Sequence, residues 1–492
     1  MLELSRRTFL AAGTAAATLP LASPLVRSAF AGADPPVFLE ATTRTIEVNG
    51  KAATVHGILQ RDGTHGLYTE AGTRFRVQLS NRLAEQTLIH WHGLTPPYQQ
   101  DGVPDLSQPA LAPGTAYDYD FPLARPGSYW MHSHVGLQEQ RLLAAPLIVR
   151  DPAEKGLDEQ EVVILLHDFT FRDPEEILEG LRQGAGHAME MGSESPAMSM
   201  GTEHSAMGHG GMAMGGQSPA AMDVDINDID FDAYLANDRT LADPEVVPVE
   251  TGGRVRLRII NGAAATNFVI DLGALQGELI AVDGHPVVPL LGNHFEIAIS
   301  QRLDIRLQLP AGQGAYPILA LREGEEQRTG IILATKGAQV HRVADGADGD
   351  APPLGLELER RLQAFPPLAP RSADLRMALD LTGSMAGYVW TLNGARYGEH
   401  RPLAFRAGER VELTLRNRTE MSHPMHMHGH VFQVVGINGE RVAGALRDTV
   451  LVPPDASVTL AFDADNPGRW AFHCHHLYHM AAGMMTSMEY LA

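Results

Sequence analysis

The stretch HCHHLYHMAAGMM, from His473 to Met485, holds the only cysteine among the 492 residues of the chain. A single thiol cannot form an internal disulfide, so its position between histidines needs another explanation. A thiolate, two imidazoles and a weak axial thioether form the ligand set of a blue-copper electron-transfer site. Cys474, His479 and Met484 follow one another at intervals of five residues, which lets one loop wrap around a single ion. The second imidazole must come from another part of the chain.

Four H-x-H pairs supply further imidazoles. They are His90 and His92 in HWHG, His132 and His134 in HSH, His426 and His428 in HPMHMHGH, and His473 and His475 around the cysteine. In a strand, residues i and i+2 project from the same face, so each pair can hold a metal with two side chains. Eight imidazoles exceed the needs of one ion and suit a cluster of three. Because Cys474 alternates with its neighbours, it points to the opposite face and links a separate copper to the cluster through a few bonds.

With these four motifs in this order, the chain resembles a multicopper oxidase over nearly all of its length after the leader. The resemblance implies four copper ions and the four-electron reduction of dioxygen to two waters, with electrons passing from Cys474 through His473 or His475. It implies that His423, Cys474, His479 and Met484 hold type 1 copper, that His90 and His426 hold type 2 copper, and that His92, His132, His134, His428, His473 and His475 hold the type 3 pair. No ligand position of the family pattern is missing.

Proton delivery to such a cluster calls for a nearby carboxylate. Asp101, in QQDGVPD, occupies the place of an acidic residue that the family uses in this way. The alternative is that Asp101 simply forms a turn with the following glycine. Some relatives carry an acidic residue after the type 1 histidine, where this chain has Met480, so half of the usual proton route has no assigned residue. Asp448, in RDTV, is a candidate for orienting metal-bound imidazoles.

Internal repeats indicate the domains. FRVQLSN ends at Asn81 and VELTLRN ends at Asn417, and in each copy histidines follow nine and eleven residues later. A third copy, VRLRIIN, ends at Asn261 but has Ile270 and Leu272 at those offsets. Alternation of apolar and polar residues in these copies is typical of strands with one buried face. The sequence therefore predicts an all-β chain of three cupredoxin-like Greek-key β-sandwich domains, with copper ligands in the first and third.

The expected units are 34–152 for the first domain, 153–338 for the second, 339–369 for a linker and 370–492 for the third. Each terminal domain provides two H-x-H pairs, so the cluster is expected at the interface between these two domains. The middle domain is then mainly a spacer that positions them.

A Met-rich insertion, 184–222, interrupts the middle domain. It contains eight of the 19 methionines, and its composition predicts disorder. Soft thioethers select Cu(I), so a copper-binding role is expected, although the methionines could be incidental. The candidate ligands are Met189, Met191, Met198, Met200, Met207, Met212 and Met214.

The N-terminus, 1–31, resembles a twin-arginine export signal, with SRRTFL at Ser5 to Leu10 followed by an Ala-rich apolar stretch. This predicts a periplasmic protein delivered by the twin-arginine machinery, without a stable membrane anchor. The formal net charge of -21 argues against nucleic-acid binding. A monomer is expected.

The copper ligands and the Met-rich insertion leave three functions open. Oxidation of Cu(I) to Cu(II) in copper tolerance accounts for both the complete ligand set and the Met-rich insertion. A laccase-like oxidase of phenols would share every copper ligand but has no use for the insertion. A periplasmic copper store would need only the insertion and would leave the oxidase site without a purpose.

Overall fold

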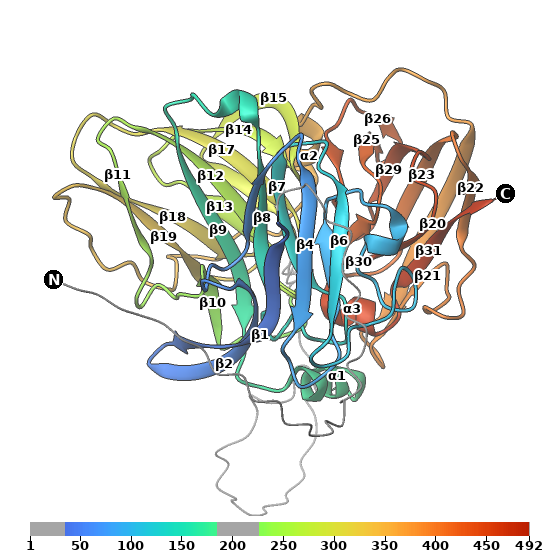
Figure 1. Ribbon diagram of the computed structural model, residues 1–492. Helices are drawn as coiled ribbons and strands as arrows, with labels where there is room; N and C mark the ends of the chain where they lie inside the picture. The colour runs from blue at the N-terminus through green and yellow to red at the C-terminus, as the bar shows by residue number, and fades with distance from the viewer. Residues whose placement is uncertain (1–34, 185–225, 492) are drawn as a thin grey trace, which may run out of the picture. The chain divides into compact units, whose positions relative to one another are not determined.

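The computed structural model describes residues 35–184 and 226–491, whose strands form six sheets (Figure 1). Two sheets enclose an apolar core in each of three cupredoxin-like domains, which we number 1 to 3 along the chain. The predicted all-β class is therefore confirmed. The boundaries expected from the sequence stay a prediction, and the methionines of the Met-rich insertion lie outside the described residues.

Domain 1 contains strands β1 to β8. One sheet has the order β2 (Lys51–Gln60), β1 (Val37–Val48), β4 (Arg74–Asn81), β6 (Ala116–Pro122). The other has the order β3 (Leu67–Glu70), β8 (Ala144–Arg150), β7 (Gly127–Ser133), β5 (Ile89–His92). Short 3-10 helices lie at Tyr98–Gln100 and Pro152–Glu154.

Domain 2 contains strands β9 to β19. One sheet has the order β10 (Ala233–Ala236), β9 (Gln160–Phe169), β12 (Arg254–Asn261), β17 (Arg302–Gln308), β14 (Gly277–Val282), β15 (His285–Gly292). The other has the order β11 (Val246–Val249), β19 (Arg328–Thr335), β18 (Ala315–Arg322), β13 (Phe268–Asp271), β16 (His294–Ile297). Helix α1 (Pro174–Arg182) follows β9 and is capped by Asp173, whose side chain accepts from the Glu175 N–H.

Domain 3 contains strands β20 to β31. One sheet has the order β21 (Val389–Leu392), β20 (Leu375–Ser384), β23 (Arg410–Asn417), β29 (Ser457–Asp463), β25 (Phe432–Ile437), β26 (Glu440–Arg441), and β27 (Leu446–Arg447) also pairs with β25. The other has the order β22 (Leu403–Arg406), β31 (Met485–Leu491), β30 (Arg469–Cys474), β24 (His423–Met427), β28 (Thr449–Val452). Helix α2 (Glu357–Arg361) precedes this domain and α3 (Leu477–Ala481) lies within it. Among the described residues, no helix is long and apolar enough to cross a membrane.

The three repeat strands β4, β12 and β23 occupy equivalent places, each parallel to the first strand of its domain. Each ends in a buried asparagine, Asn81, Asn261 or Asn417, whose amide nitrogen donates to two carbonyl oxygens and whose amide oxygen accepts from the backbone N–H two residues later. This asparagine fixes the turn that leads to the next strand of the domain. In domain 2 that strand is β13, where Ile270 is buried apolar core in place of a histidine.

Candidate metal centre

Neighbouring strands place the H-x-H pairs opposite one another in each terminal domain. In domain 1, His90 on β5 pairs directly with His132 on β7. In domain 3, His426 on β24 pairs with His473 on β30. Because both ligand strands of a domain are adjacent in one sheet, four imidazoles converge at one end of each sandwich.

The two sets of four imidazoles meet, and their Nε2 atoms approach closely. The Nε2–Nε2 distance is 3.4 Å between His90 and His426, 3.3 Å between His132 and His475, 3.4 Å between His134 and His473, and 3.0 Å between His428 and His473. The first three of these pairs join domain 1 to domain 3. The structure therefore brings together the imidazoles that the sequence predicts for the cluster, while the ion that each one holds stays a prediction.

The hydrogen-bond partners of Nδ1, the other ring nitrogen, show which nitrogen of each imidazole carries the proton. Nδ1 lies 2.8–3.0 Å from the carbonyl oxygen of Asp101 at His90, of Ser133 at His132, of Asp448 at His426 and of Cys474 at His473. A carbonyl oxygen only accepts, so each Nδ1 is the protonated nitrogen and each Nε2 presents a lone pair. Lone pairs that face each other at about 3 Å repel unless a cation lies between them. The donor set thus fits metal ions placed between the Nε2 atoms.

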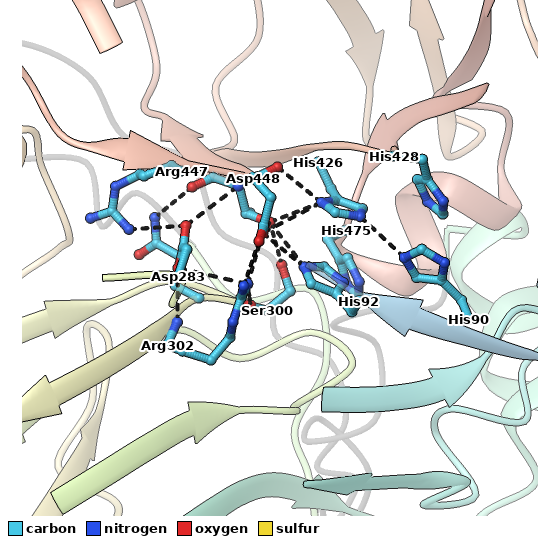
Figure 2. A network of polar contacts seen from close by, with 12 residues as sticks. His90, His92, Asp283, Ser300, Arg302, His426, His428, Arg447, Asp448 and His475 are labelled. Atoms are coloured by element: carbon cyan, nitrogen blue, oxygen red, sulfur yellow. Dashed lines mark hydrogen bonds and ion pairs between the residues drawn. The ribbon is translucent and has the colours of Figure 1, made fainter. Parts of the chain in front are cut away.

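His92 has the reverse orientation. Its Nε2 lies 3.0 Å from Asp448 Oδ1, whereas its buried Nδ1 has no hydrogen-bond partner among the described residues (Figure 2). The ring of His92 lies 5.0 Å from that of His475 and 5.6 Å from that of His132, measured between centroids. His92 therefore offers Nδ1 to the same space as these two imidazoles.

A second group of ligands surrounds Cys474. Its Sγ lies 3.7 Å from His423 Nδ1 and 3.8 Å from His479 Nδ1, and these two nitrogens are 3.2 Å apart. His423 Nε2 contacts Thr419 Oγ1 at 2.7 Å and His479 Nε2 contacts Asp228 Oδ2 at 3.0 Å, so both Nδ1 atoms are free to face the thiol. The buried Met484 accepts from the Cys474 N–H through its carbonyl oxygen, 3.0 Å away, and its axial role stays a prediction.

Burial keeps these imidazoles neutral, which metal binding requires. Desolvation, reinforced by neighbouring imidazoles, lowers the pKa of His132, His426 and His428 well below the ordinary value. Desolvation likewise lowers the pKa of His479 to about 3. Burial raises the pKa of the Cys474 thiol, so a bound cation is needed to stabilise the thiolate at this position.

The multicopper oxidase family matches residues 40–154, 160–339 and 370–491, which together span all three domains. The chain belongs to the multicopper oxidase family. As a multicopper oxidase it is an oxidoreductase that uses dioxygen as electron acceptor, and its cofactors are type 1, type 2 and type 3 copper. The resemblance inferred from the sequence is confirmed.

Individual relatives agree with this membership. The chain is 33% identical to multicopper oxidase MmcO of Mycobacterium tuberculosis, over 85% of this chain and 80% of the relative. It is 27% identical to copper resistance protein A of Escherichia coli, over 85% of this chain and 86% of the relative. The crystal structure of a multi-copper oxidase from Pseudomonas thermotolerans superposes with a TM-score of 0.69 at 25% identity, covering 93% of this chain and 99% of that one.

Two carboxylates singled out in the sequence lie among the imidazoles. Asp101 Oδ2 accepts from His428 Nδ1 at 2.8 Å, and its Oδ1 lies 3.3 Å from His90 Nδ1. Asp101 also precedes a turn, since Gly102 has a φ of +87°, so the two readings of this residue are compatible. Asp448 contacts both His92 and His426.

Sequence reasoning missed three residues that approach the ligands. Arg302 on β17 of domain 2 donates to both oxygens of Asp448, so the middle domain is more than a spacer (Figure 2). Asp228, also in domain 2, contacts His479. Glu139, between β7 and β8, contacts His132. Contacts between domains leave no periodic signal in the sequence, although the polar run from Gln138 to Arg141 visibly separates the apolar residues Leu137 and Leu142.

Proposed function

We propose that this multicopper oxidase binds four copper ions through the residues named by the family resemblance. Type 1 copper would be held by His423, Cys474 and His479, with Met484 as the fourth ligand. Type 2 copper is held by His90 and His426. The type 3 pair is held by His134, His428 and His473 on one side and by His92, His132 and His475 on the other. The facing Nε2 atoms and the unpartnered Nδ1 of His92 support this division.

When bound, copper supplies one-electron uptake from the donor and reduction of dioxygen to two waters. The chain supplies the path for electrons and the group that delivers protons. Cys474 is covalently joined to His473 and His475, which links the type 1 ligands to the cluster by a short backbone path. Asp101, in contact with His428 and His90, is the residue we assign to proton delivery at the cluster.

We propose further that the physiological donor is Cu(I), and the observation that carries this is the environment of His479. The imidazole of His479 is fully buried, and its Nε2 atom contacts the Asp228 carboxylate instead of lying at an open apolar surface. Asp228 also accepts a hydrogen bond from the Tyr388 hydroxyl, and His476 stacks on His479 with ring centroids 3.8 Å apart. A bulky aromatic donor finds no exposed imidazole edge here, and the equally buried Asp228 carboxylate would stabilise positive charge beside the type 1 ligands.

Helix α1 and Ile229 strengthen this argument. Ile177 and Leu181 of α1 and Ile229 belong to the apolar cluster that includes Tyr388, Trp390 and Leu477. Helix α1 precedes the Met-rich segment in the chain and Ile229 follows it, so the described residues on both sides of that segment pack in the same apolar cluster as Cys474. Tethered thioethers would raise the local concentration of Cu(I) there.

Relatives at 27% identity are named copper resistance protein A, which supports a role in copper tolerance. The SRRTFL motif supports export by the twin-arginine route to the periplasm.

The experiment compares steady-state oxidation of Cu(I) and of a phenol by the full protein, by a deletion of residues 185–221, and by Asp228→Asn. We expect both variants to lose at least about tenfold in kcat/KM for Cu(I), which corresponds to about 1.4 kcal/mol of transition-state stabilisation. Phenol oxidation by the deletion variant should be unchanged or faster, because a phenol has no affinity for thioether sulfur.

Asp230→Asn is the matched control, because Asp230 lies two residues from Asp228 but its side chain is 90% exposed and contacts Arg322 instead of a copper ligand. It should behave as the unmodified protein does. If the deletion lowers both activities by the same factor, the Cu(I) proposal fails and a laccase-like function takes its place. If the full protein binds copper but oxidises neither donor, a copper-storage role is favoured.

A further inference from the structure

Two buried carboxylates of the cluster share one arrangement. Asp101 contacts His90 of domain 1 and His428 of domain 3. Asp448 contacts His92 of domain 1 at 3.0 Å and His426 of domain 3 at 3.7 Å. Each carboxylate therefore bridges an imidazole from each terminal domain. The corresponding rings are also close, with centroids 3.9 Å apart for His90 and His428 and 3.7 Å apart for His92 and His426.

Glu139 completes a third bridge of the same kind. Its Oε2 lies 2.8 Å from His132 Nδ1 of domain 1, and its Oε1 lies 3.8 Å from His475 Nδ1 of domain 3. The side chain is 2% exposed, and Oε1 has no hydrogen-bond partner among the described residues. His132 Nδ1 also lies 3.0 Å from the carbonyl oxygen of Ser133. The two oxygens of Glu139 thus face the Nδ1 atoms of two imidazoles whose Nε2 atoms lie 3.3 Å apart.

The residues beside Glu139 hold its backbone in place from three domains. Gln138 accepts from Thr87 Oγ1 at 2.8 Å and from Ser133 Oγ at 2.7 Å, both within domain 1. Gln140 donates to Asp168 of domain 2 at 3.3 Å and accepts from the Tyr478 hydroxyl of domain 3 at 3.2 Å. Because its neighbours are fixed in this way, the Glu139 carboxylate is directed at the imidazoles before any metal binds.

We propose that Glu139 is a positioning residue for the type 3 site, which holds His132 and His475 with their Nε2 atoms directed at one shared ion. The proposal rests on the ligand assignment above. It gives the cluster a third cross-domain carboxylate beside Asp101 and Asp448.

Glu139→Gln separates this role from simple packing. The amide keeps the size and shape of the side chain, but it is neutral and one of its two ends is a donor, so it cannot present an acceptor oxygen to both imidazoles. Glu323→Gln is the matched control, because Glu323 is another buried glutamate that accepts two hydrogen bonds, one from Asn267 of domain 2 and one from the Leu354 N–H, neither of which is a copper ligand.

The measurements on copper-loaded protein are copper content per chain, the near-ultraviolet absorption of the type 3 pair and the blue absorption of type 1 copper. Replacing a residue that orients a metal ligand typically lowers metal affinity by about 10–100-fold. We therefore expect Glu139→Gln to lose type 3 absorption and copper content at limiting copper while keeping the blue absorption. Glu323→Gln should keep all three signals.

Glu139→Asp keeps the charge and shortens the side chain, so type 3 absorption should fall in the order Glu, Asp, Gln. The proposal is overturned if Gln retains more of this absorption than Asp, because packing would then explain the residue, or if Glu139→Gln equals the unmodified protein. An unmodified protein that lacks type 3 absorption would instead refute the ligand assignment itself.

Discussion

Replacing Arg302 by methionine tests how far the copper-free domain stabilises the cluster region. Arg302 is fully buried, and its guanidinium donates to both oxygens of Asp448 in domain 3 and to the carbonyl oxygen of Ser128 in domain 1, 3.1 Å away. Methionine fills a similar volume but cannot donate, so Asp448 would remain buried without its counter-charge. Removing one partner of a buried ion pair costs about 3–5 kcal/mol, and we expect a loss of this size in the free energy of unfolding.

The assay is equilibrium urea unfolding of the copper-free protein followed by tryptophan fluorescence. Arg376→Met is the control, because Arg376 is 69% exposed in its ion pair with Glu412 and such pairs contribute only about 0–1 kcal/mol. The double variant with Arg302→Met and Asp448→Asn should recover part of the loss, because it removes the uncompensated charge as well. The reasoning is wrong if Arg302→Met shifts the midpoint no more than Arg376→Met does, or if the double variant is as unstable as the sum of its parts.

Two further predictions concern single side chains. Met484→Leu should keep the blue colour and raise the type 1 reduction potential by about 60 mV or more, a tenfold change in the one-electron equilibrium. Redox titration measures this potential, and a shift produced by Met480→Leu instead would show that the axial residue is misassigned. Burial raises the pKa of Glu323 to about 7 from 4.5, so its contribution to stability is complete below pH 4.5 and is lost as the pH rises through 7. The free energy of unfolding across this window should therefore fall relative to that of Glu323→Gln, by on the order of 3 kcal/mol in total. A constant difference between the two proteins would contradict the assigned pKa.

The fold class and the imidazoles could be predicted because their signals are local. An H-x-H pair and the repeats that end at Asn81, Asn261 and Asn417 are each contained in one strand and its following turn. The periodicity of a strand places such side chains without knowledge of the rest of the fold.

The residues around the ligands could not be predicted in this way. Arg302 reaches Asp448 from a different domain, and Asp228 reaches His479 from the far side of the Met-rich segment. Such pairings depend on how the domains pack, which no single stretch of sequence encodes. Asp101 and Asp448 were found only because they lie inside recognisable motifs, whereas Glu139 lies in a loop with no periodicity.

The division of the cluster between β5 and β7 on one side and β24 and β30 on the other also governs when the protein can take up metal. During translation, His90, His92, His132 and His134 emerge from the ribosome long before His473 and His475 have been synthesised. A nascent chain therefore carries only half of each cross-domain pair until domain 3 has been made. Assembly of the complete cluster is in this way tied to completion of the polypeptide, and a chain that stops before β30 cannot form it.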